Sequence, residues 1–229
     1  MERTLSVPSP QLSVLFFLLT TNLQTPASGD ARPGANKPDR AKVAKEGLRQ
    51  ELLKRTREDQ DARKKLIELT SRRHAENDKA LSESAEFKSL RDIDRKNTAW
   101  LKMVVTAHGW PGKSAVGEDG AQAAWLLVQH ADHDRDFQKQ SLKLIQAAFK
   151  KGEVTGQQVA YLTDRVLVAD KRNQLYGTQF QAKDGELVPF PIEDEANVDK
   201  RRQEIGLSSL AEYKKVLEKT YKVNKPDKK

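Results

Sequence analysis

The chain contains 229 residues, of which 37% are hydrophobic and 32% are charged, and it contains no cysteine. This composition is typical of one globular domain with appendages. The missing cysteines exclude a disulfide framework, a cysteine nucleophile and a lipid-modified cysteine anchor. The formal net charge is +8, but the basic excess lies in segments 40–96 and 214–229, whereas segment 97–213 is slightly acidic. A nucleic-acid binder carries its positive charge on the binding surface, so we expect no nucleic-acid partner.

The first 39 residues are predicted to lie outside the folded domain. Arg3 precedes the apolar run LSVLFFLL, and small residues follow at 26–29. This is the pattern of a cleaved signal peptide over residues 1–29. The apolar run is shorter than the ~20 residues that a transmembrane helix needs. We therefore expect export to the periplasm or the extracellular space, no integral membrane segment in the mature chain, and a flexible linker over 30–39.

Leucines at helical spacing predict a long surface helix over residues 40–73. Its apolar stripe is interrupted by two polar residues, Asp59 and Gln60. The charge density on the remaining positions is high, which is typical of a helix with one buried stripe.

The apolar spacing resumes over residues 84–107 and predicts a second helix. The sequence HGWP should end it, because Gly109 readily adopts the left-handed cap conformation and Pro111 cannot continue a helix. Residues 112–120 are then expected to form a loop, and a third helix is expected to begin at Ala121.

The second half of the chain is predicted to be helical with one interruption. Thr155 with Gln158 has the spacing of a capping box, and Ser209 with Glu212 repeats it. Between these pairs, the Asp-Gly dipeptide at 184–185 favours a tight hairpin turn. The expected elements are helices over 137–150 and 155–169, a short β-hairpin near residues 176–190, helices after 197 and after 209, and a basic C-terminal tail over 216–229. The predicted fold is a mostly α, single helical domain over residues 40–215.

The stretch QHADHDRD, residues 129–136, directly follows the apolar run AAWLLV. On a continuing helix, Asp132 would point between Trp125 and Val128, toward the apolar side. A buried carboxylate there needs a hydrogen-bonded partner or a raised pKa. Alternatively, the helix ends just before Asp132, and Asp132 or Asp134 caps the next helix. A plain solvated turn is the third interpretation, and the sequence leaves all three open.

The same stretch invites a metal interpretation. Its alternating aspartates resemble the start of an EF-hand loop, but Phe137 stands where that loop needs glycine and Lys143 where it needs glutamate. EF-hand calcium is therefore excluded. His130 and Asp134 would share one face of a continuing helix, and His108 is predicted to reach the same region. A histidine and carboxylate site for a transition metal thus stays open, with the metal unidentified. The sequence carries no motif for a serine nucleophile or a phosphate-binding loop.

Two further polar features follow. The stretch NQLYGTQ, residues 173–179, combines neutral donors and acceptors, and it suits either the orientation of a polar ligand or a buried loop. Upstream, Asp164 and Arg165 point to different faces of one helix, so they are not expected to pair with each other. Each then needs a partner in a buried polar network, or both are surface charges.

Several short motifs occur together: D-Q-x-x-R from Asp59, HGWP from His108, WLLVQHAD ending at Asp132, DR from Asp164, and Q-x-YGTQ from Gln174. As a set, over about residues 45–215, they resemble a bacterial family of domains of unknown function, the DUF6624 type. That family has no established activity, so the resemblance implies a shared set of polar positions and no chemistry. His74 and His133 lie outside the pattern and are discounted as site residues.

We expect the polar positions of this resemblance to converge on one pocket that binds a small polar or anionic ligand. One histidine would act as general acid or base, oriented by an aspartate, which is hydrolase-like chemistry. The alternative is a non-catalytic protein-interaction domain whose polar cluster is structural. The expected catalytic residues are His108, His130, Asp132 and Asp164, and the expected ligand-binding residues are Asp59, Arg63, Arg165, Gln174, Tyr176 and Gln179.

Overall fold

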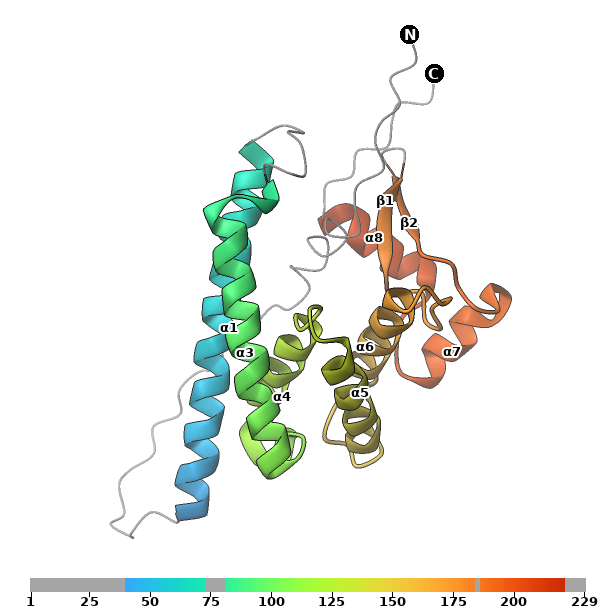
Figure 1. Cartoon of the computed structure of the whole chain (residues 1–229). Coiled ribbons are helices and arrows are strands. Elements are labelled where there is room, and N and C mark those ends of the chain that lie inside the picture. Colours follow the sequence, from blue (N-terminus) through green and yellow to red (C-terminus); the bar gives the residue numbers. More distant parts are fainter. Residues whose placement is uncertain (1–39, 73–80, 184–185, 221–229) are drawn as a thin grey trace.

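The computed structural model describes residues 40–72, 81–183 and 186–220 (Figure 1). The predicted signal peptide and linker lie outside the described residues. Within them, helices dominate and one two-stranded antiparallel sheet is present. The predicted mostly α fold with a short hairpin is therefore confirmed. None of the described helices is both long and apolar enough to span a membrane.

Two long helices, α1 (Arg40–Arg72) and α3 (Ala85–His108), lie side by side and form an arm of the molecule (Figure 1). α1 contains 33 residues, which corresponds to ~50 Å at a rise of ~1.5 Å per residue. It packs against both α3 and α4 (Lys113–Gln129). Its buried residues include Leu52 and Leu66, and also the charged residues Asp59 and Arg63. α1 therefore places one carboxylate and one guanidinium group in the interior of the protein.

The predicted loop over residues 112–120 is wrong, because α4 begins at Lys113. Its first turn is stabilised from a distance: Glu153 Oε2 accepts a hydrogen bond from Ser114 N at 2.8 Å, and a carboxylate is favourable at a helix N-terminus. The glycine that suggested a loop, Gly117, is instead a kink within α4, with φ of 74°. This capping contact comes from outside the local sequence.

α5 (Arg135–Phe149) and α6 (Gly156–Ala169) pack against each other. Asp134 Oδ1 accepts a hydrogen bond from Phe137 N at 3.1 Å, so the interpretation of Asp134 as an N-cap is correct. Thr155 and Gln158 form the predicted capping box at the start of α6. These caps satisfy amides that the first helical turn leaves without partners.

The C-terminal part places a hairpin and short helices beside α6. β1 (Phe180–Lys183) pairs antiparallel with β2 (Glu186–Pro189), and η2 (Glu195–Asn197), α7 (Val198–Glu204) and α8 (Leu210–Thr220) follow. The Tyr213 ring lies 5.9 Å from the Tyr161 ring and 5.8 Å from the Phe180 ring. The predicted start of a basic tail at residue 216 is wrong, because α8 continues and buries Leu217 one turn after Tyr213. Residues 221–229 lie outside the described residues.

Candidate functional site

A buried charged cluster forms where α1 meets the end of α4. Asp59 and Arg63 lie one turn apart on α1 and are 0% and 2% exposed, and His130, directly after α4, is 6% exposed. Arg63 Nε lies 3.2 Å from Asp59 Oδ1, and His130 Nδ1 lies 2.8 Å from Asp59 Oδ2. Asp59 thus bridges an arginine and a histidine at hydrogen-bond distance.

These contacts determine which nitrogen of His130 carries the proton. Burial acts to raise the pKa of Asp59, but His130 and Arg63 beside it lower that pKa to about 2. Asp59 is therefore ionised, and the short contact is a hydrogen bond only if His130 Nδ1 donates. Arg63 Nε also lies 3.0 Å from Nδ1, but a protonated Nδ1 cannot accept, so the Nε hydrogen is directed to Asp59.

The second ring nitrogen of His130 is then the reactive one. Burial lowers the pKa of His130, and the Arg63 charge lowers it further, against the opposing effect of Asp59. The ring is neutral with its proton on Nδ1, so Nε2 is an unprotonated acceptor. Among the described residues, the side-chain contacts of His130 with Asp59 and Arg63 are both at Nδ1. An aspartate that fixes the tautomer of a histidine is a recurring arrangement in acid and base catalysis.

Asp94 on α3 brings a second carboxyl group to the cluster. Its Oδ1 accepts a hydrogen bond from Arg63 Nη2 at 2.5 Å, and its side chain is 16% exposed. Burial raises the pKa of Asp94 to about 7; Arg63 opposes this rise and the neighbouring Asp59 adds to it. Asp94 therefore exchanges a proton near neutral pH, while Asp59 stays ionised.

Asp132 is held by a residue of α6. Arg165 Nε donates to Asp132 Oδ1 at 2.8 Å, and Arg165 Nη2 bonds to Oδ2. Gln138 Nε2 donates to Asp132 Oδ1 at 3.1 Å. Burial acts to raise the pKa of Asp132, but Arg165 and Gln138 outweigh it and the pKa is lowered. The helix does end before Asp132, and the partly buried Asp132 also belongs to a polar network, so the capping and the polar-cluster interpretations were each partly correct.

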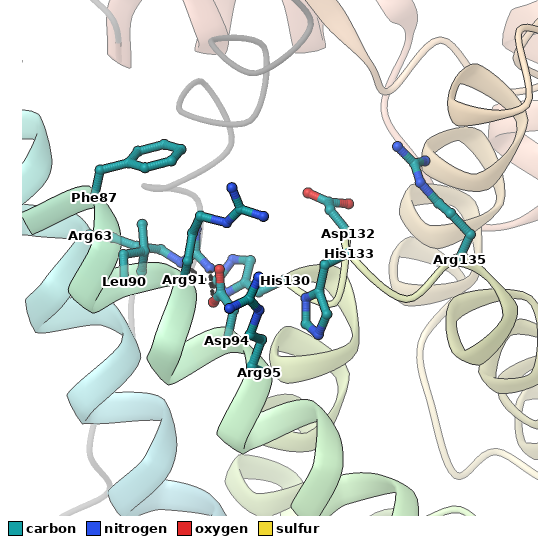
Figure 2. Close-up of a pocket in the computed structure, with 10 residues that line it drawn as sticks. All are labelled: Arg63, Phe87, Leu90, Arg91, Asp94, Arg95, His130, Asp132, His133 and Arg135. Carbon is teal, nitrogen blue, oxygen red and sulfur yellow. Dashed lines mark hydrogen bonds and ion pairs between the residues drawn. The ribbon is translucent and has the colours of Figure 1, made fainter. Parts of the chain in front are cut away.

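A pocket of about 260 Å³ opens over His130, between α3, the end of α4 and the start of α5 (Figure 2). Its lining contains four arginines against two aspartates. Within the described part of the chain, Arg91 and Arg135 make no ion pair, and Arg95 reaches only the exposed Asp92, at 3.9 Å. The lining residues are Arg63, Phe87, Leu90, Arg91, Asp94, Arg95, His130, Asp132, His133 and Arg135.

A separate cluster forms around Asp164 on α6. Its carboxylate accepts hydrogen bonds from the backbone amides of Leu175 and Thr178 at 2.8 Å each, and from Tyr176 N at 3.1 Å. Burial raises the pKa of Asp164, although these donors act to lower it. Asp164 therefore anchors the loop that precedes β1, and neither it nor Tyr176 lines the pocket.

The two glutamines of the YGTQ stretch complete this anchoring. Gln174 Oε1 accepts from Gln179 N at 2.8 Å, and Gln174 Nε2 donates to Phe190 O at 2.8 Å. Both glutamine side chains are buried. Of the two interpretations of this polar stretch, the structure supports the buried loop. Asp164 and Arg165, adjacent in sequence, do find separate partners, as their directions on the helix predicted.

The structure does not bring His108 to this region. His108 ends α3, is exposed, and does not line the pocket. The shared helix face expected for His130 and Asp134 is also not formed, because His130 follows α4 whereas Asp134 caps α5. Asp59 provides the orienting hydrogen bond to His130 that we had expected from Asp132 or Asp164.

Three potential metal ligands do lie close together. One ligand atom each of Asp59, Asp94 and His130 falls within 4.8 Å of the others. The Arg63 guanidinium, however, already bonds both carboxylates and contacts His130 Nδ1. A metal ion would either have to displace the Arg63 guanidinium from both carboxylates, or share the desolvated cluster with it and add its charge to that of the buried guanidinium. The donor set therefore fits a resident guanidinium better than a metal ion.

A family model matches residues 46–225, which include both the Asp59 cluster and the Asp164 loop. The chain belongs to the family of unknown function DUF6624. The predicted resemblance is thereby confirmed. No curated protein and no solved structure matches the chain. Membership of DUF6624 brings no established activity, so the function must be argued from the pocket.

Several pocket residues were missed because they lie outside the motifs that pointed to DUF6624. Asp94 had a readable signal: it lies four residues after Leu90 and seven before Leu101, so helical spacing places it on the buried face of α3. His133 was discounted, yet it lines the pocket beside His130. The remaining missed lining residues are Phe87, Leu90, Arg91, Arg95 and Arg135.

Proposed function

We propose that the pocket over His130 binds a small anionic substrate and that His130 and Asp94 transfer protons during its hydrolysis. The observation that carries this proposal is the arrangement of His130, whose Nδ1 is held by the ionised Asp59 at 2.8 Å while its ring lines a pocket rich in arginine. This arrangement leaves Nε2 as the basic atom of the pocket.

The charge of the lining supports an anionic ligand. Arg63 is engaged by Asp59 and Asp94, and Asp132 is engaged by Arg165. These buried pairs offset one another, so the exposed guanidinium groups of the lining supply the positive charge of the pocket. Arginine presents several N–H donors in one plane and matches the oxygens of carboxylates and phosphates. The groups available to a ligand are Arg91, Arg95 and Arg135.

The proton-transfer groups support hydrolysis. A water molecule attacks the electrophilic centre of the substrate, and its proton passes to His130 Nε2. The bond to the leaving group breaks, and the leaving group takes a proton from the Asp94 carboxyl group. The raised pKa of Asp94, about 7, allows it to be protonated at neutral pH, and the neutral state of His130 allows it to accept.

Anion binding is tested by calorimetric titration of the chain with inorganic phosphate. Arg91→Gln should weaken binding about tenfold, because a charge-assisted hydrogen bond contributes roughly 1.5–3 kcal/mol. Arg172→Gln is the matched control, since Arg172 is exposed and does not line the pocket. Equal weakening in both variants would indicate unspecific attraction and would contradict the proposal.

Hydrolysis is tested by a screen of carboxylic and phosphoric monoesters with His130→Asn. The asparagine amide retains a donor for Asp59 but has no atom equivalent to Nε2. Activity should fall by two or more orders of magnitude, which is the usual contribution of a positioned acid or base. Full activity in this variant would exclude His130 as the base.

A non-catalytic interaction domain is the second candidate. It is favoured by the pairing of the carboxylates around the pocket, because the buried Asp59 and the partly buried Asp94 and Asp132 each contact an arginine. In that case substitutions in the cluster would lower stability without any ligand response.

We also propose export, on the basis of the N-terminal sequence; the N-terminus of the mature protein, determined by mass spectrometry, tests it.

A further inference from the structure

The pocket has an apolar end as well as a cationic one. Phe87, Leu90, Arg91, Asp94 and Arg95 recur on α3 at spacings of three and four residues, so they share one face of the helix. The two apolar residues come first along this face, followed by the charged ones. In Figure 2 the Phe87 ring lies at one end, and Asp132 and Arg135 lie toward the other.

The apolar end offers a contact surface for a ligand. Leu90 is 6% exposed and belongs to the core, whereas Phe87 is only partly buried. An aromatic ring left partly exposed beside a cationic pocket retains apolar surface that a ligand can cover. Pockets for small molecules usually combine such apolar surface with a few polar groups that fix orientation.

We propose that the ligand is an amphipathic anion: a single anionic head group attached to one aryl or short alkyl group. This inference rests on the proposed anion-binding function and specifies its substrate class. The head group contacts Arg91 and its neighbours near His130, and the apolar group covers Phe87. The apolar group is therefore the part that distinguishes the substrate from a free inorganic anion.

The size of the pocket agrees with this class. Its volume of about 260 Å³ equals roughly nine water molecules at ~30 Å³ each. This is enough for a head group and one ring.

The test compares methylphosphonate with phenylphosphonate by calorimetric titration of the full chain. The two probes share one head group and contain no ester bond, so hydrolysis does not interfere. Phenylphosphonate should bind about tenfold more tightly, because the added ring removes apolar surface from water. Phe87→Ser should bring the ratio of the two dissociation constants close to one. The matched control is Phe149→Ser, at an aromatic residue 38% exposed on α5 outside the pocket lining, and it should leave the ratio unchanged.

The outcomes separate the two proposals. If neither phosphonate binds, anion binding itself is refuted and this inference falls with it. If both bind with equal affinity to the unmodified chain, the anion site stands and the amphipathic ligand is refuted. A preference for phenylphosphonate that survives Phe87→Ser would place the aromatic contact elsewhere and would overturn the assignment. Melting temperatures of both serine variants verify that they are folded.

Discussion

Replacement of Asp94 by asparagine should make the protein more stable at alkaline pH and less active. Asp94 is a carboxyl group that folding drives toward its protonated form: burial raises its pKa from 3.8 to about 7. Asparagine has nearly the same shape, cannot ionise, and can donate a hydrogen bond as the protonated acid does. Asp94→Asn therefore mimics the form that the folded protein prefers.

The magnitude follows from the shift in the pKa. A rise from 3.8 to about 7 is about three pKa units, and each unit corresponds to ~1.4 kcal/mol. Above pH 4 the unfolded chain loses the Asp94 proton while the folded protein retains it, so the stability contributed by this group decreases as pH rises. The decrease is complete once pH exceeds the folded pKa. Asp94→Asn shows no such decrease, so at pH 8.5 its free energy of unfolding should exceed that of the native chain by on the order of 4 kcal/mol.

The assay is the free energy of unfolding, from urea titrations at pH 4.5, 6, 7.5 and 8.5, for the native chain and the variant. The difference between them should be about 1 kcal/mol at pH 4.5, where the unfolded chain has already lost most of the Asp94 proton, and should increase to about 4 kcal/mol at pH 8.5. Asp92→Asn, at an exposed position on the same helix, is the matched control and should show no such increase. A difference for Asp94→Asn that is independent of pH, or that becomes negative at high pH, would refute the reasoning, because Asp94 would then be stable as a carboxylate beside Arg63.

Three further substitutions or additions test the remaining contacts. Arg165→Met should destabilise the protein by roughly 1–3 kcal/mol in urea unfolding, since it leaves the partly buried Asp132 carboxylate without its cation, and the double variant with Asp132→Asn should recover most of that loss. Asp164→Ala should cost roughly 2–4 kcal/mol and accelerate hydrogen exchange of the loop amides that it binds, because several buried donors lose their acceptor. Zinc or manganese should leave the melting temperature unchanged in the native chain, because Arg63 occupies the centre of the three potential ligands; a rise that saturates with metal concentration would contradict this.

The fold was predictable to the extent that its signals are local. The apolar spacing on α1 and α3, the capping box at Thr155, and the pairing of β1 with β2 each depend on residues within a few positions of one another. The predicted Asp-Gly turn itself, at 184–185, lies outside the described residues. The start of α4 depends on Glu153, which lies 39 positions away from the Ser114 amide that it caps. A local pattern that contains Gly117 and Gly120 favours a loop, and contacts made only in the folded protein stabilise the helix there.

The candidate site was predictable where burial and polarity conflict within one helix. Asp59 and Asp132 stood out because a helical position that should be apolar carries a carboxylate, whereas Asp164 stood out because it and Arg165 point to different faces. Each of the three aspartates has a buried partner in the structure. The sequence could not show which partner each one takes, because α1, α4 and α6 meet only in the folded protein. The arginines of the pocket were not predictable in this way, since an exposed arginine on a charged helix is also the ordinary surface residue.

The polar motifs serve two purposes, the anchoring of a loop and the building of the pocket edge, because each buried charge needs a partner of its own. Asp164 and Arg165 are neighbours on α6, yet the first anchors the loop before β1 and the second holds Asp132 at the edge of the pocket. A change in the loop is therefore expected to affect the pocket by moving α6. If Asp164→Ala lowers stability but leaves the dissociation constant for phosphate of the folded protein unchanged, the loop is purely structural. If Asp164→Ala also weakens phosphate binding by the folded protein, the loop helps to position the site to which α3 and α5 contribute their arginines.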